Sequence, residues 1–343
     1  MPNHTGLFTR CGGVGRRSQI FKLTVIPFAA ALQVGLATAP AHAAEFKAKL
    51  AQNMSPISGV AIVAQVKGFF AKHGLEISVS GFTSGKQCLN AVMGGAADIA
   101  TTAEAPTTAA AMSKQPIAFL ARMEYSDLKT LTAASSGIKT LADLKGKRIA
   151  FTAGTGSEVY TGALLKKAGL TKDDVKLTNL RPQDMLPALS NGDIDAYNIW
   201  EPHVANGKKA MPDKVAELNT KGIYAETFNV VVMQDYLEKN PKLIAAFLKA
   251  LLDAEDWMKK NPDDAISTVA KIAGMKREDL EPIWNDYVYH VTLDQKQLDV
   301  LTAHAAWRLE SGNHPPGAVM PDFTEVIFPE ALKAVAPDRV TLP

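Results

Sequence analysis

The sequence predicts an α/β fold made of two lobes, each a mostly parallel sheet flanked by helices. Strand-like and helix-like segments alternate after residue 44, and the same alternation begins again near residue 140. Because neighbouring parallel strands must be joined by a crossover, usually a helix, this alternation is typical of βαβ units. About 300 residues follow the N-terminal segment, which is enough chain for two separate hydrophobic cores.

The first block of elements is predicted from apolar periodicity. Residues 47–53 alternate as in a strand, and Ile57 to His73 carries apolar residues at helical spacing until Gly74. The next elements are a strand at 75–80, a helix at 84–93, a buried strand at 98–102 and a helix at 104–112. Two strand-like runs, at 117–123 and 128–134, complete the block.

The second block repeats the pattern. It contains a short helix at 140–145, strands at 147–152, 175–180 and 194–199, and helices at 157–168 and 183–190. One further apolar strand is expected at 227–233. Beyond it the pattern is mostly helical to about residue 310 and then rich in proline and loops.

The N-terminus has the features of an export signal. Residues 1–22 contain four basic residues and no acidic one, residues 23–39 are mostly apolar, and Ala41-His42-Ala43 supplies small residues for cleavage. This pattern predicts a secretory signal peptide over residues 1–43, cut near Ala43, and a periplasmic location. Pro27 and the thin apolar composition disfavour a membrane anchor. Arg16-Arg17 leaves the general and twin-arginine export routes open.

Composition excludes several classes of partner. Without residues 1–43 the chain has 33 Lys and Arg against 35 Asp and Glu, so no basic surface predicts nucleic-acid binding. Cys88 is then the single cysteine, so no internal disulfide can form. The histidines lack zinc-type spacing, and we expect neither a metal nor a cofactor.

The stretch AFTAGTGSEVY, residues 150–160, predicts a strand, a glycine turn and a helix start. Such an arrangement leaves backbone N–H groups free to bind an anion. A dinucleotide fingerprint would need glycine where Val159 stands, and a phosphate-binding P-loop would need a lysine before Lys166. Two interpretations stay open: an anion site for a small solute, or a structural turn with Ser157 as N-cap.

Four stretches together identify a family. The sequence resembles the periplasmic solute-binding proteins of nitrate, sulfonate and taurine ABC importers, a group that includes the thiamin-pyrimidine precursor proteins. The stretches that carry the resemblance are Lys67–Phe70 with His73–Leu75, Ser84-Gly85 with Gly94–Ala100, Thr140–Ala150, and Asn191–Ala196 running into Trp200-Glu201-Pro202.

The resemblance implies a type II-like periplasmic-binding-protein fold with the ligand in a cleft between lobes that close by a hinge. Lobe 1 would comprise residues 44–132 plus 227–343, and lobe 2 residues 133–226. The implied partners are a small-molecule solute and an ABC permease and ATPase at the inner membrane. The protein would be a monomer and not an enzyme.

Strand ends and helix starts then mark the cleft candidates, since ligands of such sheets lie beyond the carboxyl ends of the strands. We expect an anionic group, a sulfonate or carboxylate, at the helix starts near Ser84 and Thr155. Glu104, if it faces the cleft, would accept hydrogen bonds from an amine or an amide N–H. A zwitterion such as taurine would satisfy both ends. The candidates are Met54, Ser55, Ser84, Thr102, Glu104, Thr155, Gly156, Ser157, Tyr160, Trp200 and Asn229.

Each candidate has a structural alternative, and so has the function. Ser84 and Ser157 are suitable N-caps, Tyr160 and Trp200 suit a core, and Glu201 fits the first turn of a helix. A periplasmic sensor that presents its ligand to a receptor is an alternative function. A fold-related enzyme, of desulfinase or pyrimidine-synthase type, would need a reactive cysteine or histidine in the cleft, whereas Cys88 stands among apolar residues.

Overall fold

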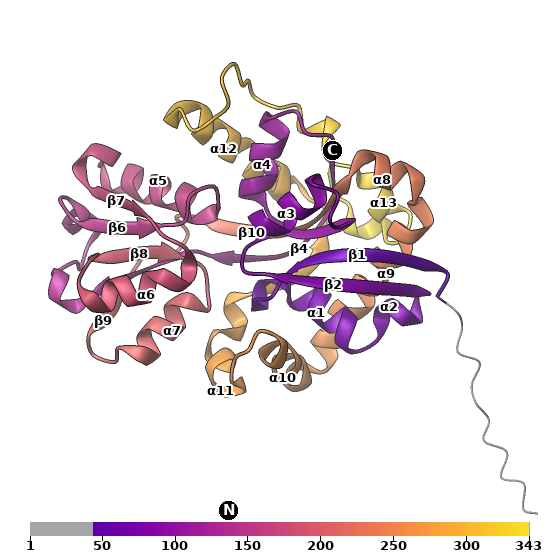
Figure 1. Ribbon diagram of the computed structural model, residues 1–343, viewed down its shortest axis with the longest axis horizontal. Coiled ribbons are helices and arrows are strands. Elements are labelled where there is room, and N and C mark those ends of the chain that lie inside the picture. Colours follow the sequence, from indigo (N-terminus) through magenta and orange to yellow (C-terminus); the bar gives the residue numbers. More distant parts are fainter. Residues whose placement is uncertain (1–43, 343) are drawn as a thin grey trace, which may run out of the picture. The chain divides into compact units, whose positions relative to one another are not determined.

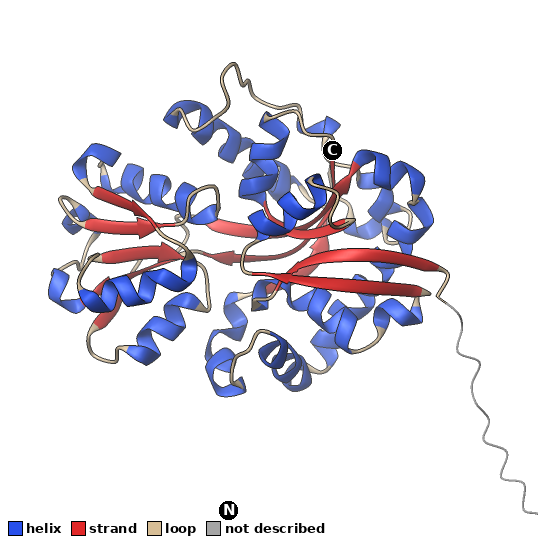
Figure 2. Cartoon of the chain, viewed as in Figure 1, coloured by secondary structure: helices blue, strands red, loops and turns tan. Residues whose placement is uncertain are grey.

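The computed structural model describes residues 44–342, which form two β-sheets flanked by helices (Figures 1 and 2). The predicted signal peptide lies outside these residues. The six-stranded sheet has the order β11-β4-β10-β3-β1-β2, and the five-stranded sheet the order β7-β6-β8-β5-β9. The strands are β1 (Phe46–Asn53), β2 (Leu75–Phe82), β3 (Ile99–Ala103), β4 (Ile117–Asp127), β5 (Lys129–Ala133), β6 (Arg148–Phe151), β7 (Lys176–Asn179), β8 (Ala196–Ile199), β9 (Val215–Leu218), β10 (Ala225–Met233) and β11 (Val288–Thr292).

The helices follow the predicted order. They are α1 (Gly59–Val66), α2 (Phe69–Lys72), α3 (Gly85–Met93), α4 (Glu104–Met112), α5 (Gly156–Ala168), α6 (Pro182–Asn191), α7 (His203–Ala210), α8 (Gln234–Lys239), α9 (Pro241–Lys260), α10 (Pro262–Ile272), α11 (Arg277–Leu280), α12 (Gln295–Ser311) and α13 (Pro329–Lys333), with short 3-10 turns between some of them. The helix predicted over 57–73 is divided, because Gly68 adopts a left-handed φ of 77° between α1 and α2. Strands β9 and β11 were not predicted.

The two-lobed α/β class is confirmed, but the sheets are mixed rather than mostly parallel. Strand β1 is parallel to β2 and β3, and β6 is parallel to β7 and β8. In contrast, β10 is antiparallel to β3 and β4, and β5 is antiparallel to β8 and β9. An apolar run predicts that a strand is buried and contains no information on its direction, so the sequence pattern could not show this.

The chain passes between the sheets twice. Leu128 separates β4 from β5, and residues 219–224 separate β9 from β10. Residues 129–132, which we expected in lobe 1, therefore pair within the five-stranded sheet. We retain the division into two lobes as a proposal, with the first crossing at Leu128.

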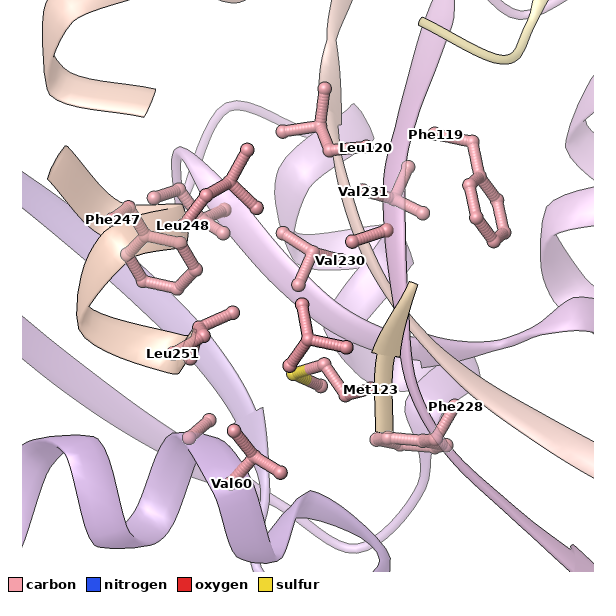
Figure 3. Close-up of a cluster of buried hydrophobic side chains, with 14 of the residues drawn as sticks. Val60, Phe119, Leu120, Met123, Phe228, Val230, Val231, Phe247, Leu248 and Leu251 are labelled. Atoms are coloured by element: carbon pink, nitrogen blue, oxygen red, sulfur yellow. The ribbon is translucent and has the colours of Figure 1, made fainter. Parts of the chain in front are cut away.

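Each sheet has its own hydrophobic core. In the six-stranded half, Val60 of α1, Met123 of β4, Val230 of β10 and Phe247 of α9 pack together (Figure 3). In the other half, a cluster that includes Leu131, Ile149, Leu164 and Tyr197 packs α5 and its neighbours onto the sheet. In each half, the helices and the sheet bury their apolar faces against one another, as layered α/β structures do.

Candidate functional site

A small cavity lies where the two halves meet. Its volume is about 10 Å³, roughly the space of one water molecule. One half of the chain lines the cavity with side chains from the ends of β1, β3 and β10 and from the start of α3. The other half lines it with side chains from the start of α5 and the end of β8. The lining residues are Asn53, Ile57, Ser84, Gly85, Lys86, Ala103, Pro106, Thr155, Trp200, Glu226 and Phe228.

Three predicted residues, Ser84, Thr155 and Trp200, line this cavity. Ser84 caps α3, where its Oγ accepts from the Gln87 N–H at 3.4 Å. Thr155 caps α5, where its Oγ1 accepts from the Ser157 N–H at 3.2 Å. Both caps satisfy a helix without any ligand, yet they also bring two helix N-termini to one cavity. That these residues bind a solute stays a prediction.

Ser157 does not cap the helix, as one interpretation of the sequence held. It is fully buried, accepts a hydrogen bond from the Thr152 N–H at 2.9 Å and donates to the Asn198 carbonyl at 2.6 Å. The cap is Thr155, one residue before the helix begins. Ser157 instead joins the glycine turn to β8, so its hydroxyl is occupied by the protein.

Replacing Ser157 with alanine should therefore lower stability. The substitution removes the partner of the partly buried Thr152 N–H and of the buried Asn198 carbonyl, which costs about 1–3 kcal/mol of unfolding free energy. Urea denaturation measures this loss, with Ser113→Ala as control, because Ser113 makes a comparable bond to a carbonyl on an exposed helix end. An unchanged urea midpoint for Ser157→Ala would contradict the assignment.

Two predicted residues support the cavity from behind. The Thr102 hydroxyl donates to the Gly85 carbonyl at 2.9 Å, which fixes the start of α3. The Ser55 N–H donates to Asn53 Oδ1 at 2.8 Å, which orients Asn53. Neither Thr102 nor Ser55 lines the cavity, and each holds a residue that does.

Three further predicted residues lie apart from the cavity. Met54 packs over Gly81 at the end of β2. The buried Tyr160 hydroxyl contacts Thr130 and Thr220 at 2.8 and 2.6 Å. Asn229 is fully buried, and its Nδ2 donates to the Thr227 carbonyl at 3.2 Å. Strand ends are close to the cleft, but the direction of each side chain decides whether it reaches it.

Glu104 is completely buried behind the cavity. The Tyr224 hydroxyl donates to its Oε1, and the Thr227 N–H donates to its Oε2 at 2.7 Å. Burial raises the pKa of Glu104 to about 7, although these hydrogen bonds oppose the shift. Glu104 does not line the cavity, so the predicted contact with an amine would need the site to rearrange.

The raised pKa predicts a pH dependence of stability. Between pH 4.5 and about 7, Glu104 is protonated when folded but ionised when unfolded, so its stabilising contribution falls as pH rises through this window. Chemical denaturation across the window should give a steeper decline for the wild type than for Glu104→Gln, which keeps an acceptor for Tyr224. Equal slopes for both proteins would refute this account.

Glu226 is the acidic residue among the lining residues that the sequence analysis did not predict. It is 3 % exposed and belongs to β10, which extends two residues N-terminal to the predicted strand. A Cβ built on Gly156 would lie 2.5 Å from Glu226 Oε2, so the carboxyl group lies against the first turn of α5. The available signal in the sequence was an acidic residue directly before an apolar strand. The turn expected to hold a solute anion therefore faces a carboxyl group of the protein itself.

Two other sequence interpretations are confirmed. Glu201 has a structural role, since its Oε2 accepts from the Ala205 N–H at 2.9 Å and its Oε1 from Lys129 Nζ at 2.9 Å. Cys88 is fully buried, and burial raises the pKa of its thiol to about 12. Such a thiol is protonated at neutral pH and is a poor nucleophile. Within residues 44–342, no group of His, Cys, Asp and Glu could hold a metal ion.

Comparison with known proteins decides the family. The family model described as NMT1/THI5 like matches residues 56–265, which is more than half of the chain. The chain belongs to this family. Among curated relatives, the taurine-binding periplasmic protein of Escherichia coli is 30 % identical over 228 residues, or 64 % of this chain and 71 % of that protein. A putative aliphatic sulfonates-binding protein of the same species is 29 % identical over 223 residues, or 63 % and 66 %.

The fold of this NMT1/THI5-like chain also matches solved structures. The alkanesulfonate-binding protein of Xanthomonas axonopodis pv. citri, bound to MOPS, gives a TM-score of 0.73 at 19 % identity and covers 82 % of this chain and 98 % of its own. At this identity the likeness shows the fold alone. It is the periplasmic-binding-protein fold that the family resemblance implied.

Proposed function

We propose that this NMT1/THI5-like protein is an extracytoplasmic solute-binding protein that captures a small organic solute and delivers it to an ABC importer. The observation that carries the proposal is the cavity between the halves, where Ser84 and Thr155 at two helix starts meet Trp200. Its relatives include proteins named for binding taurine and aliphatic sulfonates. A site enclosed by two halves of the chain suits capture by closure.

The solute was predicted to be anionic or zwitterionic, and we favour a taurine-like zwitterion. Two helix N-termini at the cavity suit a sulfonate or carboxylate. The Glu226 carboxyl group in the same cavity would receive no counter-charge from a solute with negative charge only. A solute that carries both charges accommodates both features.

We further propose that the protein works as a periplasmic monomer with an ABC permease and ATPase as partners. The proposal rests on the predicted signal peptide and on relatives that are periplasmic binding proteins. None of the helices in residues 44–342 is long and apolar enough to span a bilayer. N-terminal sequencing of the exported protein should begin at Ala44, and retention of residues 1–30 would overturn this part.

A fold-related enzyme is the less favoured function. One structure with this fold is a mutant of DszB in complex with biphenyl-2-sulfinic acid, with a TM-score of 0.65 at 16 % identity. In the present chain the buried Cys88 thiol does not line the cavity, and neither does any described histidine. Among the described residues, neither a thiol nor an imidazole therefore lies at the candidate site.

Two measurements test the binding function directly. Native mass spectrometry of the protein purified from its own periplasm should show a small molecule bound one to one. Calorimetric titration should then give saturable binding of that molecule, with taurine and ethanesulfonate as first probes. Failure to find a bound molecule and to bind any periplasmic extract fraction would overturn the proposal.

Closure provides a further prediction. A cavity of about 10 Å³ cannot hold an organic solute, so the halves must separate to admit one. Contacts that would break on opening include Lys166 with Glu310 at 3.2 Å and Lys209 with Asp279 at 2.6 Å. Small-angle scattering should therefore give a smaller radius of gyration with saturating solute than without it.

A matched variant tests closure away from the cavity. A Cβ on Gly162 of α5 would collide with the Trp307 indole of α12, whereas neither residue lines the cavity. Gly162→Val should keep the larger radius even with saturating solute. Equal radii with and without solute in the wild type would contradict the hinge motion and leave binding itself intact.

A further inference from the structure

The cavity contains a buried carboxyl group without a partner. Glu226 is 3 % exposed and lines the cavity together with Trp200 and Phe228. Within residues 44–342 no group donates a hydrogen bond to its carboxyl oxygens, and Oε2 lies at the first turn of α5. Buried polar side chains in native proteins nearly always have hydrogen-bond partners. An unpartnered carboxyl group that faces the cavity therefore indicates a partner that arrives with the solute.

The ionisable groups around Glu226 indicate which charge that partner carries. Glu104 of α4 and Glu124 of β4 are also buried. Besides burial, the charge of Glu104 raises the pKa of Glu226, and the charges of Glu226 and Glu104 raise the pKa of Glu124. Lys86 is the cation among the described lining residues, but its side chain is mostly exposed and its Nζ donates to the Ala153 carbonyl at 3.3 Å. Arg308 of α12 is buried outside the cavity and donates to the Asn313 carbonyl. A solute with negative charge only would supply no counter-charge to these carboxyl groups.

The walls of the cavity suit a cationic nitrogen group. Trp200 comes from the end of β8 and Phe228 from β10, so aromatic side chains face the cavity from both halves. Aromatic faces attract ammonium and guanidinium-like cations, most strongly where water is excluded. A carboxylate beside them adds direct charge pairing.

We propose, building on the solute-binding function, that the solute presents a cationic nitrogen group to Glu226 between Trp200 and Phe228. The class comprises primary ammonium, amidinium and protonated amino-heterocycles. Glu226 acts as the counter-charge of the solute, and the proton it loses passes to solvent.

The release of a proton follows from the surroundings of Glu226. Burial, and secondly the charge of Glu104, hold the pKa of the Glu226 carboxyl well above its usual range. The groups that face this region from other elements are Glu104, Glu124, Tyr224, Lys86 and Arg308. A bound cation favours the ionised carboxylate, so solute affinity should rise with pH until Glu226 is ionised in the empty protein.

The experiment compares probes that differ only in their nitrogen. Calorimetric titrations of the full mature protein use taurine against isethionate, and 4-aminobutyrate against 4-hydroxybutyrate. We expect an amine to bind at least tenfold more tightly than its hydroxyl counterpart. Glu226→Gln should remove this preference, while Glu238→Gln, an exposed acid on α8, should leave it unchanged. Thermal melting checks that both variants are folded.

Calorimetric titration in two buffers of different ionisation enthalpy measures the number of protons released on binding. The wild type should release up to one proton per bound amine near pH 6, and Glu226→Gln none. Equal or tighter binding of the hydroxyl probes, or an amine preference that survives Glu226→Gln, would overturn this inference and leave solute binding intact. No binding of any probe, together with no co-purified molecule in native mass spectrometry, would overturn the proposed function and this inference with it.

Discussion

Replacing Gly156 with valine is expected to abolish solute binding. Gly156 is the first residue of α5, and an added Cβ would lie 2.5 Å from Glu226 Oε2 and 3.5 Å from the Tyr224 ring. Glu226 is buried and has little room to move, so the branched side chain would push the two halves apart at the cavity. We expect a loss of at least about a hundredfold in affinity, which corresponds to about 2.8 kcal/mol.

The control for Gly156→Val is Gln295→Val. Gln295 is likewise the first residue of a helix, α12, but it is exposed and does not line the cavity. Calorimetry on the co-purified solute and circular dichroism on both variants separate binding from folding. Gly156→Ala, with a smaller side chain, should give an intermediate affinity. Wild-type affinity in Gly156→Val would show that the first turn of α5 does not enclose the solute.

Replacing Gly85 with alanine is expected to destabilise the protein strongly. A Cβ on Gly85 would lie 2.8 Å from the Ala103 nitrogen and 2.9 Å from the Thr102 Cα. Both are backbone atoms of β3 in the middle of a sheet, so they cannot yield as a side chain would. The start of α3 must move away from the sheet, at a cost of about 3 kcal/mol in unfolding free energy.

Urea denaturation measures this effect as a lower midpoint with an unchanged slope. Gly94→Ala is the matched control at the other end of α3. Its added Cβ would approach the Asn90 carbonyl at 3.1 Å and should cost less than about 1 kcal/mol. If Gly85→Ala unfolded at the same midpoint as the wild type, the close approach of α3 to β3 would not be a structural requirement.

Gly85 and Gly156 show what the sequence indicates about a residue and what only the folded structure shows. The sequence places Gly85 and Gly156 beside the starts of the predicted helices 84–93 and 157–168. Only the folded chain shows that one glycine is required by a neighbouring backbone and the other by a carboxyl group from a distant strand. Contacts between residues far apart in the chain leave no local pattern.

Local physics determined much of the fold from the sequence alone. Apolar periodicity and glycine positions were sufficient to place most helices and strands. The ends of strands and starts of helices marked Ser84 and Thr155 as cleft candidates, although the capping signal pointed to Ser157 rather than Thr155. These signals depend on interactions within a few residues, such as capping and the alternation of side chains. They can therefore be recognised in a single sequence.

The tertiary structure decided what local physics could not. Strands β9 and β11 are short and partly exposed, so their patterns are weak, and they form because a neighbouring strand offers its edge. The antiparallel placement of β10 between β3 and β4 brings Glu226 to the cavity, while Ser157 and Asn229 turn into the protein. Strand direction and packing between the two halves decide which side chains face a solute. Both depend on the free energy of the whole fold, so no single segment of the sequence determines them.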